Sequence, residues 1–127
     1  ELPEELEGCG FVIALEPDAD GGLWASVTGG PGQGGVAHYD ASGAATAYTP
    51  EGSALPSTRV RDILVTDGGE VWFASDLGVA RIDADGEWHS ITSLTTGLGC
   101  NIVLGLAEGS DGSIWFATAR GVSRYAP

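Results

Sequence analysis

The chain has 127 residues and a formal net charge of −13, with five positive residues, all of them arginine, against 18 acidic ones. Such a surface repels nucleic acid phosphates and anionic lipid head groups, so neither nucleic acid binding nor membrane insertion is expected. The sequence contains no run of about 20 apolar residues, as a membrane span would need, and no signal-peptide pattern. It also contains no methionine, which suggests a processed chain or a piece of something longer.

One sequence pattern occurs three times along the chain. The segments VIALEPDADGGLW, VRDILVTDGGEVW and VLGLAEGSDGSIW begin at Val12, Val60 and Val103, and each ends on a tryptophan. The last two segments are 43 residues apart. The first two have the same spacing once five extra residues in the glycine-rich tract 28–35 are left out. The chain is therefore an array of internal repeats.

Each repeat holds about four short apolar runs separated by Asp-Gly or Gly signals, which predicts a four-stranded antiparallel sheet. In the middle repeat we expect strands near 60–65, 71–75, 79–82 and 87–91. The innermost runs are apolar on both faces and need cover on both sides, and no amphipathic helix period is present to supply it. Repeated sheets that cover one another are blades of a β-propeller. A β-sandwich or a β-solenoid would not explain this spacing as well.

The predicted fold is all-β, with about three blades in a single propeller segment over residues 1–127. Blade 1 covers about 11–50, blade 2 about 60–93, and blade 3 about 103–127 without its outer strand. A propeller ring has 4 to 8 blades, so a second chain or a longer parent propeller must complete it. Unpaired strand edges invite pairing with another chain, which favours a homo-oligomer, with a dimer first. A structural self-assembly unit is an alternative function.

The middle repeat, ALPSTRVRDILVTDGGEVWFASDLGVARID at residues 54–83, resembles the repeat of the two-component regulator propeller family. Residues 97–125 follow the same pattern, with Gly99 and Cys100 in place of Pro-Ser, and the first repeat departs from it at His38 and at its insertion. The resemblance implies a ligand- or partner-sensing ectodomain in an extracytoplasmic location, periplasmic or cell surface. The DGxxWF pieces bear a weaker resemblance to streptogramin B lyase, a propeller enzyme that uses a metal and a histidine.

The candidate binding face is the one where the fourth-to-first and second-to-third strand loops gather around the propeller channel. Loops on a rigid scaffold are where binding residues concentrate. Arg59 and Arg120 suit an anionic ligand within an acidic surface, although pairing with Asp62 or Asp76 is the alternative. The candidate ligand-binding residues on these loops are Gln33, Arg59, Asp76, Asn101 and Arg120.

No nucleophile-base-acid grouping, phosphate-binding glycine loop or catalytic carboxylate pair has a recognisable spacing. We therefore predict no catalytic residue, no metal site and no cofactor, and a binding module is favoured over a lyase-like enzyme. The tracts that begin at Asp18 and Asp83 resemble the start of a calcium loop but lack its later glutamate, so tight turns are expected.

Cys9 and Cys100 occupy equivalent repeat positions two blades apart. This predicts no disulfide within one chain and leaves an interchain bond open.

Overall fold

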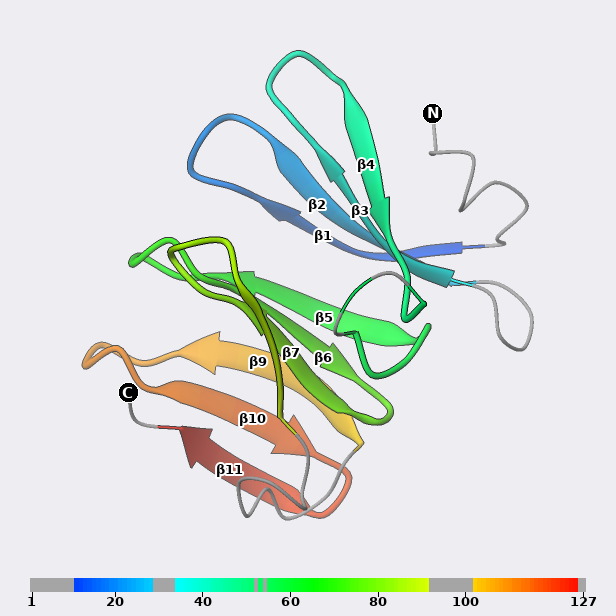
Figure 1. Ribbon diagram of the computed structural model, residues 1–127. Helices are drawn as coiled ribbons and strands as arrows, with labels where there is room; N and C mark the ends of the chain where they lie inside the picture. Colours follow the sequence, from blue (N-terminus) through cyan, green and yellow to red (C-terminus); the bar gives the residue numbers. More distant parts are fainter. Residues whose placement is uncertain (1–10, 29–33, 52, 54, 92–101, 126–127) are drawn as a thin grey trace.

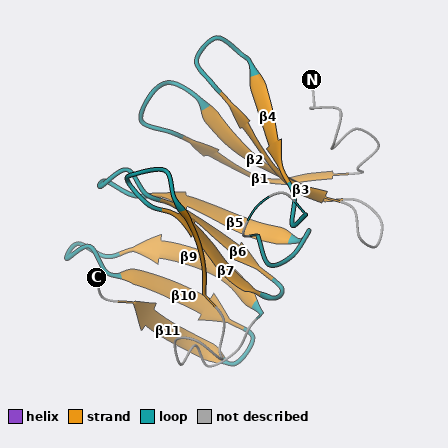
Figure 2. Ribbon diagram, viewed as in Figure 1, coloured by secondary structure: helices purple, strands orange, loops and turns teal. Residues whose placement is uncertain are grey.

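A computed structural model describes residues 11–28, 34–51, 53, 55–91 and 102–125. Within these residues the chain forms three antiparallel sheets and no helix (Figure 2). The first sheet contains β1 (Phe11–Pro17), β2 (Leu23–Thr28), β3 (Gly34–Tyr39) and β4 (Ala45–Tyr48). The second contains β5 (Val60–Val65), β6 (Val71–Ser75), β7 (Gly78–Ile82) and β8 (Trp88–Ile91). The third contains β9 (Val103–Glu108), β10 (Ile114–Thr118) and β11 (Gly121–Tyr125).

The sheets are stacked face to face, and the first strands β1, β5 and β9 lie next to one another along one side of the stack (Figure 1). Within each sheet the strands follow the chain order, so successive strands are neighbours. This confirms the prediction of β-propeller blades, and the strands of the middle repeat begin and end within a residue of where they were expected. In the described residues the third sheet ends at β11, without a fourth strand.

Tight turns close the strand pairs, and aspartate side chains hold them. Asp18 Oδ1 accepts the backbone N–H groups of Asp20 at 2.9 Å and Gly22 at 2.7 Å. Gly21 has a φ of 86°, a left-handed conformation that glycine adopts at little cost. Asp83 caps the β7–β8 turn, which falls at a different place in the repeat, in the same way. Both acidic tracts therefore form turns, as predicted.

The core lies between the sheets, and one rule places its aromatic residues. Trp24 and Trp72, at the tryptophan position of the repeat, point toward the following sheet. Phe73 and Phe116, each directly after a repeat tryptophan, point toward the preceding sheet. Thus Trp24 meets Phe73 edge-on at 5.2 Å between ring centroids. Trp72, which is fully buried, meets Phe116 at 5.8 Å and Tyr125 at 5.3 Å. The side-chain alternation of β6 thus fills both of the interfaces that blade 2 makes.

Hydrogen bonds also join neighbouring sheets near the inner strands. The Ser26 hydroxyl donates to the backbone carbonyl of Val60. The backbone N–H of Leu106 donates to Asp62 Oδ2 at 2.9 Å. Such bonds fix the lateral position of one sheet on the next, which apolar contacts alone specify weakly.

Candidate functional site

The strands of all three sheets end on two opposite faces of the stack (Figure 1). We call the face with the β1–β2, β3–β4, β5–β6, β7–β8 and β9–β10 turns the turn face. The face with the connections β2–β3, β6–β7 and β10–β11, and with the connections between sheets, is the loop face. The loop face is the one on which the sequence predicts binding.

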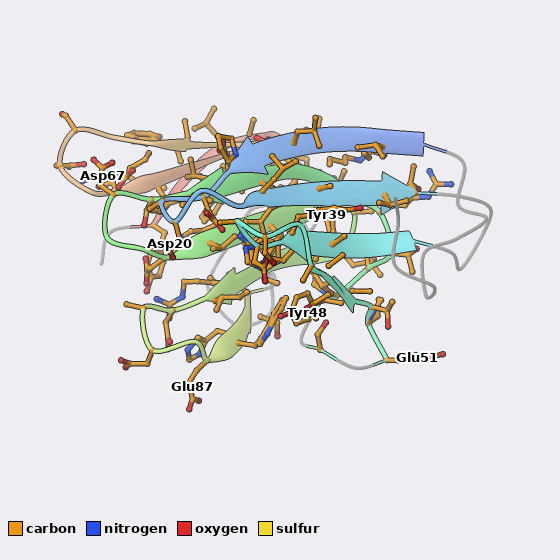
Figure 3. All side chains as sticks on the ribbon, turned by 90° about the horizontal axis from the view of Figure 1, so that it is seen from above. Asp20, Tyr39, Tyr48, Glu51, Asp67 and Glu87 are labelled. Carbon is orange, nitrogen blue, oxygen red and sulfur yellow. The ribbon has the colours of Figure 1, made fainter. Side chains whose placement is uncertain are left out.

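Acidic residues gather on the turn face. Asp20 and Asp67 lie at that end of the strands in Figure 3, whereas Glu51 lies at the other end. On the loop face the described acids are Glu51 and Asp76, with Asp62 next to Arg61 near the start of β5. The acidic residues of the turn face are Asp18, Asp20, Asp40, Asp67, Glu70, Asp83, Asp85, Glu87, Glu108 and Asp111.

Arginines show the opposite distribution. Arg59 and Arg61 lie at the start of β5 and Arg120 lies in the β10–β11 turn, so three of the five arginines are at the loop face. The other two, Arg81 and Arg124, lie on strands and pair with Glu70 and Asp111. Among the described residues, the loop face is therefore where the local charge best suits an anion.

Two of the predicted site residues are exposed arginines. Arg59 is exposed, and its backbone N–H donates to Ser57 Oγ at 3.0 Å. Arg120 is exposed, and its backbone N–H donates to Thr118 Oγ1 at 3.2 Å. Among the described residues neither guanidinium has an ion-pair partner. Local turns thus hold the two backbones while both charged groups face solvent.

Asp76, a predicted site residue, pairs with an arginine other than Arg59 and Arg120, the two partners suggested by the sequence. Arg61 Nε donates to Asp76 Oδ1 at 2.5 Å. The alternative that Arg59 or Arg120 pairs with Asp62 or Asp76 is therefore wrong. Asp62 is used instead as an acceptor between blades 2 and 3.

Arg61 is the site residue that sequence reasoning missed. The β5–β6 register shifts between Val60 and Asp62, so Arg61 is the extra residue of a β-bulge. The other inner strands have the same irregularity, at Ile13 in β1 and Leu104 in β9. A bulge redirects a side chain out of the regular alternation. The signal in the sequence was a cation at a repeat position that is apolar in the other two repeats.

Two predicted site residues, Gln33 and Asn101, lie outside the described residues. Cys9 and Cys100 also lie outside them, and the disulfide prediction stays a prediction.

Both histidines are engaged by aspartates. His38 Nε2 and Asp18 Oδ2 are 2.6 Å apart, and the His38 ring lies 4.5 Å from the Trp24 ring. Blade 2 has the same arrangement, in which Arg81 lies over Trp72 and pairs with Glu70. His38 is therefore the counterpart of a residue that braces the blade. His89 Nε2 is 2.8 Å from Asp83 Oδ2.

These contacts favour the ionised carboxylates. The hydrogen bond from His38 lowers the pKa of Asp18 below its ordinary value of 3.8, and the backbone N–H groups of Gly22 and Asp20 lower it further against the effect of burial. The bond from His89, followed by the Glu87 N–H, lowers the pKa of Asp83 in the same way.

The Asp18→Asn variant tests this electrostatic bracing of blade 1. A carboxylate whose pKa is lower in the folded state stabilises the fold above its unfolded pKa, and the contribution is lost as pH falls through the folded pKa. We expect Asp18→Asn to be less stable than the wild type at about pH 5, with the difference shrinking toward about pH 2.5. Urea unfolding across this range measures it, and Asp20→Asn in the same turn is the control. A difference independent of pH would contradict the bracing.

Among the described residues, no group of three or more histidine, cysteine, aspartate or glutamate side chains is arranged to hold a metal ion. That part of the chain likewise has no helix long and apolar enough to cross a membrane.

A shallow hollow of 520 Å³ lies on the turn face, lined by Asp67, Glu108, Gly109, Ser110 and Gly112. Its two carboxylates disfavour an anion. The hollow also lies on the opposite face from Arg59 and Arg120.

Comparison with known proteins confirms the resemblance seen in the sequence. The profile of the two component regulator propeller family matches residues 97–120. The fold is similar to the extracellular domains of two proteins of B. thetaiotaomicron that are described as hybrid two component systems. For these the TM-scores are 0.74 and 0.77, each at 21% identity over 91% and 100% of this chain. It is also similar to virginiamycin B lyase from Staphylococcus aureus, with a TM-score of 0.62 and 21% identity over 91% of this chain.

The chain spans 16% and 17% of the length of the two extracellular domains and 41% of the lyase. At these identities the likeness shows the propeller fold. No curated protein matches the sequence at a significant level.

Proposed function

We propose that the chain is a non-enzymatic binding or sensing module of β-propeller type, with the loop face as its binding surface for an anionic ligand or partner. One observation carries this proposal. In a chain of net charge −13, the guanidinium groups of Arg59 and Arg120 lack ion-pair partners among the described residues. Both lie at the face where those residues include few carboxylates. Arg61, held by Asp76, adds a third cation at the same face.

The setting of the module is part of the same proposal. Residues 1–127 act as one propeller segment outside the cytoplasm, which the likeness to extracellular domains supports. The segment is completed into a closed ring, with a second copy of the chain as the favoured partner. The shares of 16% and 17% also fit the alternative of a longer propeller.

Titration with citrate, a compact polyanion, tests the loop face. We expect the double variant Arg59→Gln with Arg120→Gln to weaken citrate binding at low salt by about tenfold or more, because each lost charge-assisted bond contributes about 1.5–3 kcal/mol. Calorimetry measures the affinity. Arg124→Gln is the matched control, because that arginine lies on a strand and pairs with Asp111. Binding that is unchanged in the double variant, or equally weakened in the control, would reject the site.

Two other functions remain as candidates, each with an observation behind it. A structural self-assembly unit is favoured by the large apolar side chains exposed on blades 1 and 3. A lyase-like enzyme is favoured by the likeness to virginiamycin B lyase. Self-assembly requires a mass that grows with concentration without stopping at a dimer. The enzyme requires metal-dependent turnover that is lost in His38→Ala or His89→Ala.

A further inference from the structure

The first strand of each sheet carries an exposed residue at the position of its β-bulge. Val60 and Val103 begin β5 and β9 and are fully buried. The residue after each is the extra residue of the bulge, Arg61 in β5 and Leu104 in β9, and both are exposed. Ile13 has the same place in β1 and is exposed as well. One repeat position thus presents a side chain to solvent in all three blades.

The exposure at this position does not come from an uncovered sheet. Ile13 is 45% exposed and Leu104 is 48% exposed. The Arg61 side chain is 41% exposed, although its sheet has a neighbour on both sides. The valine before the bulge behaves differently, since Val12 is 50% exposed where Val60 is 0% exposed. Because β5 is the edge strand of a sheet covered on both faces, the Arg61 side chain must point outward along that edge.

We call Ile13, Arg61 and Leu104 the bulge row. Their strands β1, β5 and β9 lie next to one another along one side of the stack (Figure 1). Cα atoms of β5 come within 8 Å of Cα atoms of both β1 and β9. The bulge row is therefore a short line of side chains across three blades, with an arginine between two aliphatic residues.

The centre of the row suits an anion even though Arg61 already has a partner. Asp76 accepts a bond from Arg61 Nε, and one carboxylate can take only two of the five donors of a guanidinium group. The neighbouring carboxylate, Asp62, accepts the backbone N–H of Leu106 in blade 3. Arg59, two residues before Arg61, is exposed and adds positive charge. Arg61 therefore keeps donors for a second carboxylate.

The spacing of the row matches an extended peptide. Side chains on one side of an extended chain are two residues apart, about 6.8 Å. This is close to the separation of the inner strands, whose Cα atoms approach within 8 Å. A peptide crossing these strands would place one apolar side chain on Ile13, an acidic side chain on Arg61, and a second apolar side chain on Leu104. Burial of aliphatic surface and a charge-assisted hydrogen bond would both stabilise the complex.

We infer that the bulge row binds an extended segment of a partner protein with the pattern apolar-x-acidic-x-apolar. The inference rests on the proposed function, because Arg59 and Arg61 belong to the loop face, and it names the chemistry of the partner. A compact polyanion offers no apolar group to Ile13 or Leu104. The order of apolar and acidic side chains, as well as the charge, therefore determines the affinity.

Short peptides with blocked ends test the pattern on the wild-type chain. Calorimetry compares acetyl-LTETL-amide with acetyl-ETLTL-amide, which has the same composition but carries its acid at one end. A third peptide, acetyl-LTQTL-amide, lacks the charge. We expect LTETL to bind at least about fivefold more tightly than either of the others. Equal binding of LTETL and ETLTL, or no binding of LTETL, would overturn the inference.

Two variants assign the peptide to the bulge row. We expect Arg61→Gln to weaken LTETL binding by about tenfold or more, because a charge-assisted bond is lost. Leu104→Ser should weaken it by about fivefold, because an apolar contact is lost. Arg124→Gln and Val122→Ser are the matched controls. Arg124 pairs with Asp111, and Val122 is 70% exposed on β11, two strands away from β9. Circular dichroism and the melting temperature check that each variant keeps its fold.

Row variants that bind LTETL as well as the wild type, or controls that weaken it equally, would reject the bulge row as the peptide site. The citrate titration is read separately, because its double variant changes Arg59 and Arg120 and leaves the row intact. Citrate binding that depends on those two arginines, without a preference for LTETL, would reject the row and keep the anion site. A preference for LTETL that is lost in Arg61→Gln, with citrate binding unchanged in the double variant, would do the reverse.

Discussion

The Trp72→Ala variant should lose about 3–5 kcal/mol of unfolding free energy, the usual cost of removing a buried tryptophan side chain. Trp72 is fully buried between blades 2 and 3, where it contacts Phe116 and Tyr125 and lies under the guanidinium of Arg81. Alanine would leave a cavity at the centre of this interface. Guanidinium unfolding at one fixed protein concentration measures the loss, since a dimer makes apparent stability depend on concentration.

Trp72→Phe refines this result. Phenylalanine keeps an aromatic ring in the interface. The indole N–H that it removes is buried and has no hydrogen-bond partner among the described residues. Relief of that unsatisfied donor offsets part of the lost contact, so the cost should be clearly below that of alanine. Leu77→Ala, an exposed site, is the control and should change stability by less than about 0.5 kcal/mol. An alanine variant as stable as the wild type would refute the packing of blade 2 on blade 3.

Phe73→Ala should cost a similar amount, about 3–5 kcal/mol, but at the other interface of blade 2. Phe73 is fully buried, stacks on Trp88 at 5.4 Å, and meets Trp24 edge-on. Repeat proteins depend on contacts between neighbouring units, so this change should loosen blade 1 from blade 2 and leave blade 3 in place. Hydrogen exchange resolved by segment should show faster exchange in β1–β4 than in β9–β11.

Phe73→Leu is a milder substitution at the same position, for comparison with Phe73→Ala. Leucine refills much of the space, so we expect a smaller loss of stability and little change in exchange. If Phe73→Ala instead accelerated exchange equally in all three sheets, the stack would unfold as a single unit, and the blade-by-blade description would be wrong.

The fold could be predicted from the sequence because its signals are local and repeated. Asp-Gly pairs mark turns such as the one at Asp18, glycine marks the start of the third strand at Gly78, and the 43-residue spacing repeats both. Each blade therefore supplied independent evidence for the same set of strands.

The site was less predictable, because its pairings depend on register. The contact between Arg61 and Asp76 exists because a bulge follows Val60, and a sequence pattern does not show where a bulge redirects a side chain. The role of Asp62 as an acceptor for the Leu106 N–H depends on the position of the third sheet relative to the second. Similarly, the presence of His38 in place of arginine did not reveal that Asp18 and Trp24 would hold it.

The mass of the wild-type chain in solution tests most directly whether these blades are half of a closed ring. Light scattering on a sizing column, with and without reductant, measures it over a wide range of protein concentration. We predict a single species with twice the mass of one chain, whose mass stays constant as concentration rises. Separation into single chains in reductant would add a cysteine bond between the two chains. A monomer in both buffers, or a mass that keeps growing with concentration, would contradict the closed ring.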